Sequence, residues 1–191
     1  MTGRTHDLAA FTALSLVLVS QPLPQMSLAT GLVAFSANMI GGLVPDIDQP
    51  TADLWRRLPA GTIFGKLLSP ILGGHRFISH SILGIILFGW GSSFLLKTMS
   101  SVLLVDMSIV WWSFMIGFIS HLIMDTFTKE GVPWLFPIPF RFGLPPLKFF
   151  RITTGGLLEK SFVFPGLLIL NGYLVYKNYP LYLDFIKHYL R

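Results

Sequence analysis

Long apolar stretches separated by more polar ones set the hydropathy pattern of the chain. No side chain between residues 8 and 44 is charged, and only a proline-rich turn at 21–25 interrupts this run. A helix needs about 20 apolar residues to cross a bilayer, so this part predicts two membrane segments, 7–20 and 26–44. Three further apolar segments follow at residues 77–96, 107–125 and 162–178. The pattern predicts an all-α integral membrane helical bundle with about five membrane segments.

Two long polar stretches, 51–75 and 126–160, are expected to form loops between these segments. The first includes residues 64–72, which are apolar enough to lie at the membrane surface, and the second is rich in proline and aromatic residues. The tail, 180–191, alternates apolar and polar positions, as is typical of an interfacial helix. No internal repeat is visible, so we expect one domain over residues 1–191.

The composition supports a membrane protein. Hydrophobic residues make up 52% of the chain and charged residues 12%, whereas soluble domains carry about 25% charged residues. Because the chain has no cysteine, disulfides and thiolate ligands are excluded, and a metal would need His, Asp, Glu or water. The pI of about 9.7 fits basic cytoplasmic loops better than nucleic-acid binding, since Lys and Arg do not form one run.

Five crossings would bring most of the ionisable motifs to one side of the membrane. The residues on that side are His6, Asp46, Asp48, His75, His80, His121, Asp125, Glu130 and Glu159. Of the 14 Lys and Arg residues, ten would lie on this side and four on the other, so the positive-inside rule predicts that it is cytoplasmic. Ionisable groups at a membrane are costly and often mark function.

His121 and Asp125 form the central motif of this side. They lie four residues apart and share a helix face, and an imidazole with a carboxylate suits a divalent metal such as zinc. The competing interpretation is a capped helix end. Asp46 and Asp48 point the same way if their stretch is extended, so both could be ligands, although the pair could also be a solvated turn. His80, at the start of the third segment, faces inward and is a further candidate ligand.

Other residues on this side have more than one interpretation. His6 is either a ligand or an interfacial histidine, and His75 is either a second ligand or a proton donor. Arg76 either clamps a phosphate or carboxylate or anchors the chain at the interface. Glu159 is a general base, a ligand, or a charge favoured by a helix N-terminus. Glu130 is expected to be solvated.

Several short motifs together resemble a known family. They are Arg4-Thr5-His6, Pro45-Asp46-Ile47-Asp48, His75-Arg76 with Ser79-His80-Ser81, and His121-x-x-x-Asp125 followed by Gly131-Val132. Over about residues 1–160 the chain is similar to the YdjM-like family of bacterial inner-membrane proteins, described as metal-dependent hydrolases. The resemblance implies a multi-pass protein of the bacterial inner membrane.

The order of these residues is also similar, more weakly, to the ligand order of zinc-dependent phospholipase C and related zinc nucleases. That resemblance implies the metal ligands His6, Asp46, His80, His121 and Asp125, with Asp125 able to bridge two metals. Those enzymes use further histidines for another zinc, but no histidine occurs here between Asp125 and His188. We therefore expect one or two Zn²⁺ ions, with Mn²⁺ or Fe²⁺ as alternatives.

These features predict a membrane-bound metal-dependent hydrolase with its active site at the cytoplasmic face. A metal ion activates water and polarises the bond to be cleaved. The predicted proton-transfer residues are Asp48, His75 and Glu159. Negative charge would be stabilised by Arg76, together with Lys129 or Arg151. The aromatic loop 133–150 favours an amphipathic substrate, such as a phospholipid or a lipid-linked phosphoester.

Two other functions fit the same residues. A divalent-metal transporter would also gather Asp and His, although carriers usually place their sites near the membrane midplane on interrupted helices. A non-catalytic regulator or scaffold would use the metal only to stabilise its cytoplasmic face. In each case we expect membrane lipids, and no nucleic acid, as partners.

Overall fold

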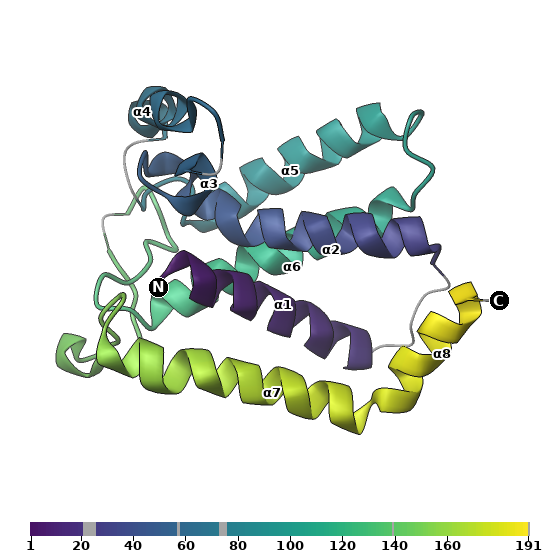
Figure 1. Cartoon of the computed structure of the whole chain (residues 1–191). Coiled ribbons are helices and arrows are strands. Elements are labelled where there is room, and N and C mark those ends of the chain that lie inside the picture. The colour runs from purple at the N-terminus through teal and green to yellow at the C-terminus, as the bar shows by residue number, and fades with distance from the viewer. Residues whose placement is uncertain (21–25, 57, 73–75, 139, 191) are drawn as a thin grey trace.

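A computed structural model describes residues 1–20, 26–56, 58–72, 76–138 and 140–190. The α-helices are α1 (Gly3–Ser20), α2 (Leu28–Leu43), α3 (Asp53–Arg56), α4 (Gly61–Ile71), α5 (Ile82–Met99), α6 (Met107–Thr126), α7 (Phe164–Lys177) and α8 (Tyr179–Leu190) (Figure 1). The described residues also form two 3-10 helices, η1 (Val44–Asp48) and η2 (Lys148–Phe150), and one π-helix, η3 (Glu159–Val163). The prediction of an all-α membrane bundle is confirmed.

Helix α6 lies at the centre of the bundle and packs most extensively against α2. Two glycines permit this close approach. A Cβ atom on Gly117 would lie 2.1 Å from the carbonyl oxygen of Asn38, and one on Gly41 would lie 2.1 Å from that of Phe114. The Asn38 amide also donates to the carbonyl oxygen of Ser113 at 3.0 Å. Small residues and interhelical hydrogen bonds of this kind hold membrane helices together.

Helices α1 and α7 form one side of the bundle. Helix α1 packs against α6, α2 and α7, and the Asn171 amide of α7 donates to the Thr12 hydroxyl of α1 at 2.7 Å. In Figure 1, the N-terminus and the long loops lie at one end of the bundle, and α8 lies at the other. We call the first end the site end, because the polar residues described below lie there.

The number of membrane segments differs from the prediction. Among the described residues, three helices are long and apolar enough to cross a membrane: Leu28–Asp48, Ile82–Met99 and Met107–Thr126. The predicted count of about five is therefore wrong by this measure. Helix α1 carries Arg4, His6 and Asp7 in its first turns, and α7 has only 14 residues. Of these three residues, His6 is buried in the site described below.

The start of α5 also differs from the predicted segment 77–96. The helix begins at Ile82, because the hydroxyl of Ser81 accepts a hydrogen bond from the Gly84 amide at 3.1 Å and caps it. Residues 76–81 form a turn before the helix. This turn carries part of the site.

The loop between α6 and α7 is held by a few specific contacts. Val132 pairs with Phe142 in an isolated antiparallel bridge, and Val132 is fully buried. The carbonyl oxygen of Trp134 accepts a hydrogen bond from the Ile82 amide at 3.0 Å. The loop is thereby fastened to the start of α5, next to the turn 76–81.

Candidate metal centre

His121 and Asp125 lie one turn apart on α6, both buried. The Nδ1 atom of His121 is 2.7 Å from the carbonyl oxygen of Gly42. A carbonyl oxygen can only accept, so Nδ1 donates this hydrogen bond, and Nε2 is the ring nitrogen that faces Asp125. Within the described residues, the buried Nε2 atom has no hydrogen-bond partner. This is how a protein usually orients a metal-binding imidazole.

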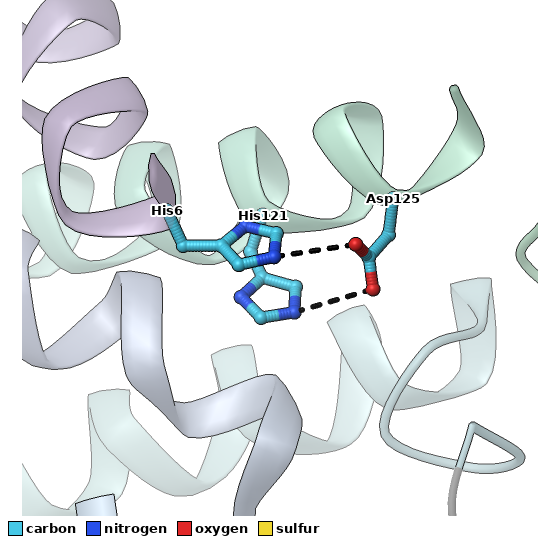
Figure 2. Close-up of side chains that lie close together, drawn as sticks. All are labelled: His6, His121 and Asp125. Carbon is cyan, nitrogen blue, oxygen red and sulfur yellow. Dashed lines mark ion pairs between the residues drawn. The ribbon is translucent and has the colours of Figure 1, made fainter. Parts of the chain in front are cut away.

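His6 joins this pair from α1. Its ring stacks on the ring of His121, with centroids 3.6 Å apart and planes 9° from parallel. Figure 2 shows both imidazoles directed at the Asp125 carboxylate. The Nε2 atom of His6 lies 3.2 Å from Oδ1 of Asp125, and that of His121 lies 3.7 Å from Oδ2. The first turns of α1 are therefore polar because they supply a wall of the site.

His80 and Asp46 complete the cluster from the turn 76–81 and from η1. Nε2 of His80 lies 3.6 Å from Oδ1 of Asp46 and 3.7 Å from Oδ2 of Asp125. Nε2 of His121 lies 3.6 Å from the same Asp46 oxygen. Two triads of candidate ligands result: His6, His121 and Asp125 form one, and Asp46, His80 and His121 form the other. Within each triad, the ligand atoms lie within 4.8 Å of one another.

These separations fit a metal ion better than direct hydrogen bonding. Distances of 3.6 to 3.7 Å are too long for hydrogen bonds. Ligands about 2.0–2.2 Å from a tetrahedral zinc ion lie about 3.3–3.6 Å from one another. Two imidazole nitrogens and two carboxylate oxygens therefore follow one another in a ring, and neighbouring atoms lie at close to the spacing of ligands on one Zn²⁺ ion.

Asp48 lies behind His80, on the far side of that ring from the cluster. Its Oδ2 accepts a short hydrogen bond from the Ser79 hydroxyl, and the Ser79 oxygen lies 2.9 Å from Nδ1 of His80. Because the hydroxyl proton goes to Asp48, the His80 Nδ1 proton is donated to Ser79, and Nε2 is the ring nitrogen that faces the cluster. Asp48 thus orients a candidate ligand through Ser79. Burial lowers the pKa of His80, but the nearby Asp125, Asp48 and Asp46 carboxylates raise it above its ordinary value.

Arg76 is buried beside the cluster. Its Nη2 lies 2.6 Å from Oδ2 of Asp125, and Nη1 donates to the Thr128 hydroxyl at 3.2 Å. The backbone of Arg76 has a φ of 63°, a strained value for a non-glycine residue, and its amide donates to Asp48. The N-terminal amine also contacts Asp125. These cations offset the carboxylate charge. His75, the neighbouring candidate, lies outside the described residues.

Glu159 is buried apart from the two triads. Both of its oxygens are taken by donors: the amide and hydroxyl of Thr2, the hydroxyl of Thr5 and the amide of Gly155, at 2.6 to 2.8 Å. Burial raises the pKa of Glu159, but the hydrogen bonds outweigh it and hold the pKa below its ordinary value. Glu159 therefore fastens the N-terminal segment, which carries His6, to the start of η3.

A cavity of about 660 Å³ opens beside the cluster, and His6, Asp46 and His121 line it. Three basic residues also line it: Arg4 from α1, Arg56 from α3 and Lys160 from η3. They come from three separate segments, so no spacing in the sequence points to them. The predicted Arg151 is instead held in its own loop by the carbonyl oxygens of Pro145 and Pro146, and Lys129 is exposed.

Comparison with known proteins gives one consistent result. The family model described as YdjM inner membrane protein matches residues 1–181. The uncharacterized protein YvsG of Bacillus subtilis is 31% identical over 92% of this chain and 95% of its own length. The inner membrane protein YdjM of Escherichia coli is 33% identical over 55% of this chain and 50% of its own length. No solved structure matches.

Proposed function

Because the chain belongs to the YdjM inner membrane protein family, we propose that it is a membrane-embedded metal-dependent hydrolase with its site at the polar end of the bundle. The observation that carries the proposal is the spacing of four ligand atoms, three from buried residues and one from the half-buried Asp46. Nε2 of His80 and His121 alternate with Oδ1 of Asp46 and Oδ2 of Asp125, each neighbouring pair being 3.6 or 3.7 Å apart.

These four residues would hold one Zn²⁺ ion, because nitrogen and oxygen ligands suit it. His6, stacked on His121 and close to Oδ1 of Asp125, would be a further ligand, with His121 and Asp125, for a second ion. When bound, a divalent ion supplies Lewis acidity, which activates water and polarises an ester oxygen.

Residues of the chain prepare the site in two ways. The hydroxyl of Ser79 and the carboxylate of Asp48 hold the ring of His80 with Nε2 toward the cluster. Arg76 contacts Asp125 and offsets its charge, so that the carboxylates can lie together without strong repulsion. The proton-transfer roles of Asp48, His75 and Glu159 stay predictions.

The cavity supports an anionic, amphipathic substrate. Arg4, Arg56 and Lys160 would bind a phosphate group by charge-assisted hydrogen bonds. Apolar side chains of Leu43, Leu54 and Phe164 line the same space and would accept the hydrocarbon next to such a group. We therefore propose a phospholipid or a lipid-linked phosphoester as the substrate class.

The test is hydrolysis of phosphatidate, phosphatidylglycerol and a chromogenic phosphodiester by protein purified in detergent and dialysed against Zn²⁺, Mn²⁺ or Fe²⁺. We expect product release that needs the metal, is lost in His121→Ala and persists in Glu130→Gln, whose side chain is 55% exposed. Full metal occupancy without hydrolysis of any substrate would overturn the enzymatic function and favour a metal-stabilised scaffold. Metal uptake into protein-containing liposomes would favour a transporter.

A further inference from the structure

Helix α4 carries an apolar surface that the described residues do not cover. Ile63, Phe64, Leu67 and Ile71 are 62%, 56%, 62% and 71% exposed. At 100° per residue these four positions occupy one flank of the helix. Exposed apolar side chains on a single helix flank call for a specific partner.

The rest of α4 divides into two other flanks. Gly61 and Gly65 face the protein, where a Cβ atom would lie 2.1 Å from the carbonyl oxygen of Trp55 and 2.8 Å from its side chain, respectively. Thr62 and Lys66 are exposed and lie on a third flank, roughly 135° around the helix from the centre of the apolar one. The helix is therefore held along its glycine side, and its apolar and polar flanks are separate and both exposed.

The position of α4 identifies the partner. In Figure 1, α4 is seen end-on at the site end, crosswise to α2 and α6, so it would lie parallel to a membrane that these two helices cross. It follows closely on the span Leu28–Asp48 in the chain. Lys66 on α4 and Arg56 on α3 add the positive charge that suits anionic lipid headgroups.

We propose that α4 is an interfacial helix, with its apolar flank inserted into the lipid leaflet at the site end and its polar flank in water. Amphipathic helices bind membranes in this orientation. The proposal is independent of any catalytic activity.

Seating α4 in the leaflet also fixes the depth of the candidate metal centre. Gly65 packs against Trp55, and the Trp55 indole donates to the carbonyl oxygen of Ile47 at 3.0 Å. Ile47 lies between Asp46 and Asp48. The helix is thus connected through one tryptophan to the turn that carries these two carboxylates, and that turn is held at the level of the lipid headgroups.

The absence of cysteine makes a direct test simple. Four single-cysteine variants are labelled with an environment-sensitive fluorophore: Ile63→Cys and Leu67→Cys on the apolar flank, and the matched Thr62→Cys and Lys66→Cys on the polar flank. The full-length protein is reconstituted into phosphatidylethanolamine–phosphatidylglycerol vesicles, with or without bromine on the acyl chains. Thermal unfolding of each variant confirms that it is folded.

We expect the labels at 63 and 67 to show a blue-shifted emission and a loss of fluorescence in brominated lipid. The labels at 62 and 66 are instead expected to lose fluorescence with aqueous iodide. Iodide quenching at all four positions would overturn the proposal. So would shielding at 63 and 67 that disappears when the protein is diluted in excess lipid, because that result would indicate a second copy of the chain.

Discussion

Replacing Glu159 with glutamine tests whether one buried carboxylate fastens the N-terminal segment to η3. Four donors from Thr2, Thr5 and Gly155 reach it. Glutamine keeps the shape, but its NH₂ group cannot accept, so at least one donor is left facing another donor. A hydrogen bond to a charged group contributes about 1.5–3 kcal/mol. Loss of one bond and weakening of the others should lower the free energy of unfolding by roughly 2–4 kcal/mol.

The effect should depend on pH in a defined direction. The hydrogen bonds hold the pKa of Glu159 below its ordinary value of 4.5. The carboxylate therefore contributes its full stabilisation above the pKa of the unfolded chain, and loses it as the pH falls through the lower pKa of the folded protein. Wild type and Glu159→Gln should differ most at neutral pH and converge in acid.

Thermal unfolding in detergent, followed by tryptophan fluorescence, measures this effect. At neutral pH we expect Glu159→Gln to melt roughly 5–15 °C below wild type. The control is Glu130→Gln, whose side chain is 55% exposed and meets only Arg76 among the ion pairs described; its effect should stay within about 0.5 kcal/mol. Equal melting of Glu159→Gln and wild type at neutral pH, or an equal loss in the control, would refute the reasoning.

Two further predictions concern packing and ligand orientation. Gly117→Ala puts a Cβ atom 2.1 Å from the Asn38 carbonyl oxygen and should lower the free energy of unfolding by about 1–3 kcal/mol. The control is Gly91→Ala, whose Cβ atom would meet nothing within 4 Å; it should be neutral or up to about 1 kcal/mol stabilising. Equal melting temperatures of the two variants would contradict the close crossing of α2 and α6. Ser79→Ala removes the hydroxyl that connects Asp48 to the His80 ring. It should weaken Zn²⁺ binding about 10- to 100-fold, as measured by competition with a chelator. Unchanged affinity would show that Ser79 does not orient His80.

The convergence of the candidate ligands could be predicted from the sequence. His121 and Asp125 share a helix face by spacing alone, and tracing the segments places His6, Asp46 and His80 at the same end. The shared end does not depend on how many helices cross the membrane, because it follows from the direction in which each helix runs. The structure brings these five residues together.

Other features depend on three-dimensional packing. The sequence does not distinguish Asp46, which faces the cluster, from Asp48, which lies behind His80. An extended stretch would point both side chains the same way. Residues 44–48 form a 3-10 helix instead, so the two carboxylates point in different directions. Likewise, the bonds of Glu159 to Thr2 and Thr5 span more than 150 positions of the chain, and no local pattern signals such contacts.

The metal content of the purified protein tests the central claim most directly. Wild type, His121→Ala and the control Glu130→Gln are purified in detergent, dialysed against Zn²⁺, and analysed by elemental mass spectrometry. We predict one or two tightly bound equivalents in wild type and Glu130→Gln, and a loss in His121→Ala, since His121 belongs to both ligand triads. Absence of stoichiometric metal from wild type, or full retention in His121→Ala, would contradict a metal centre at this site.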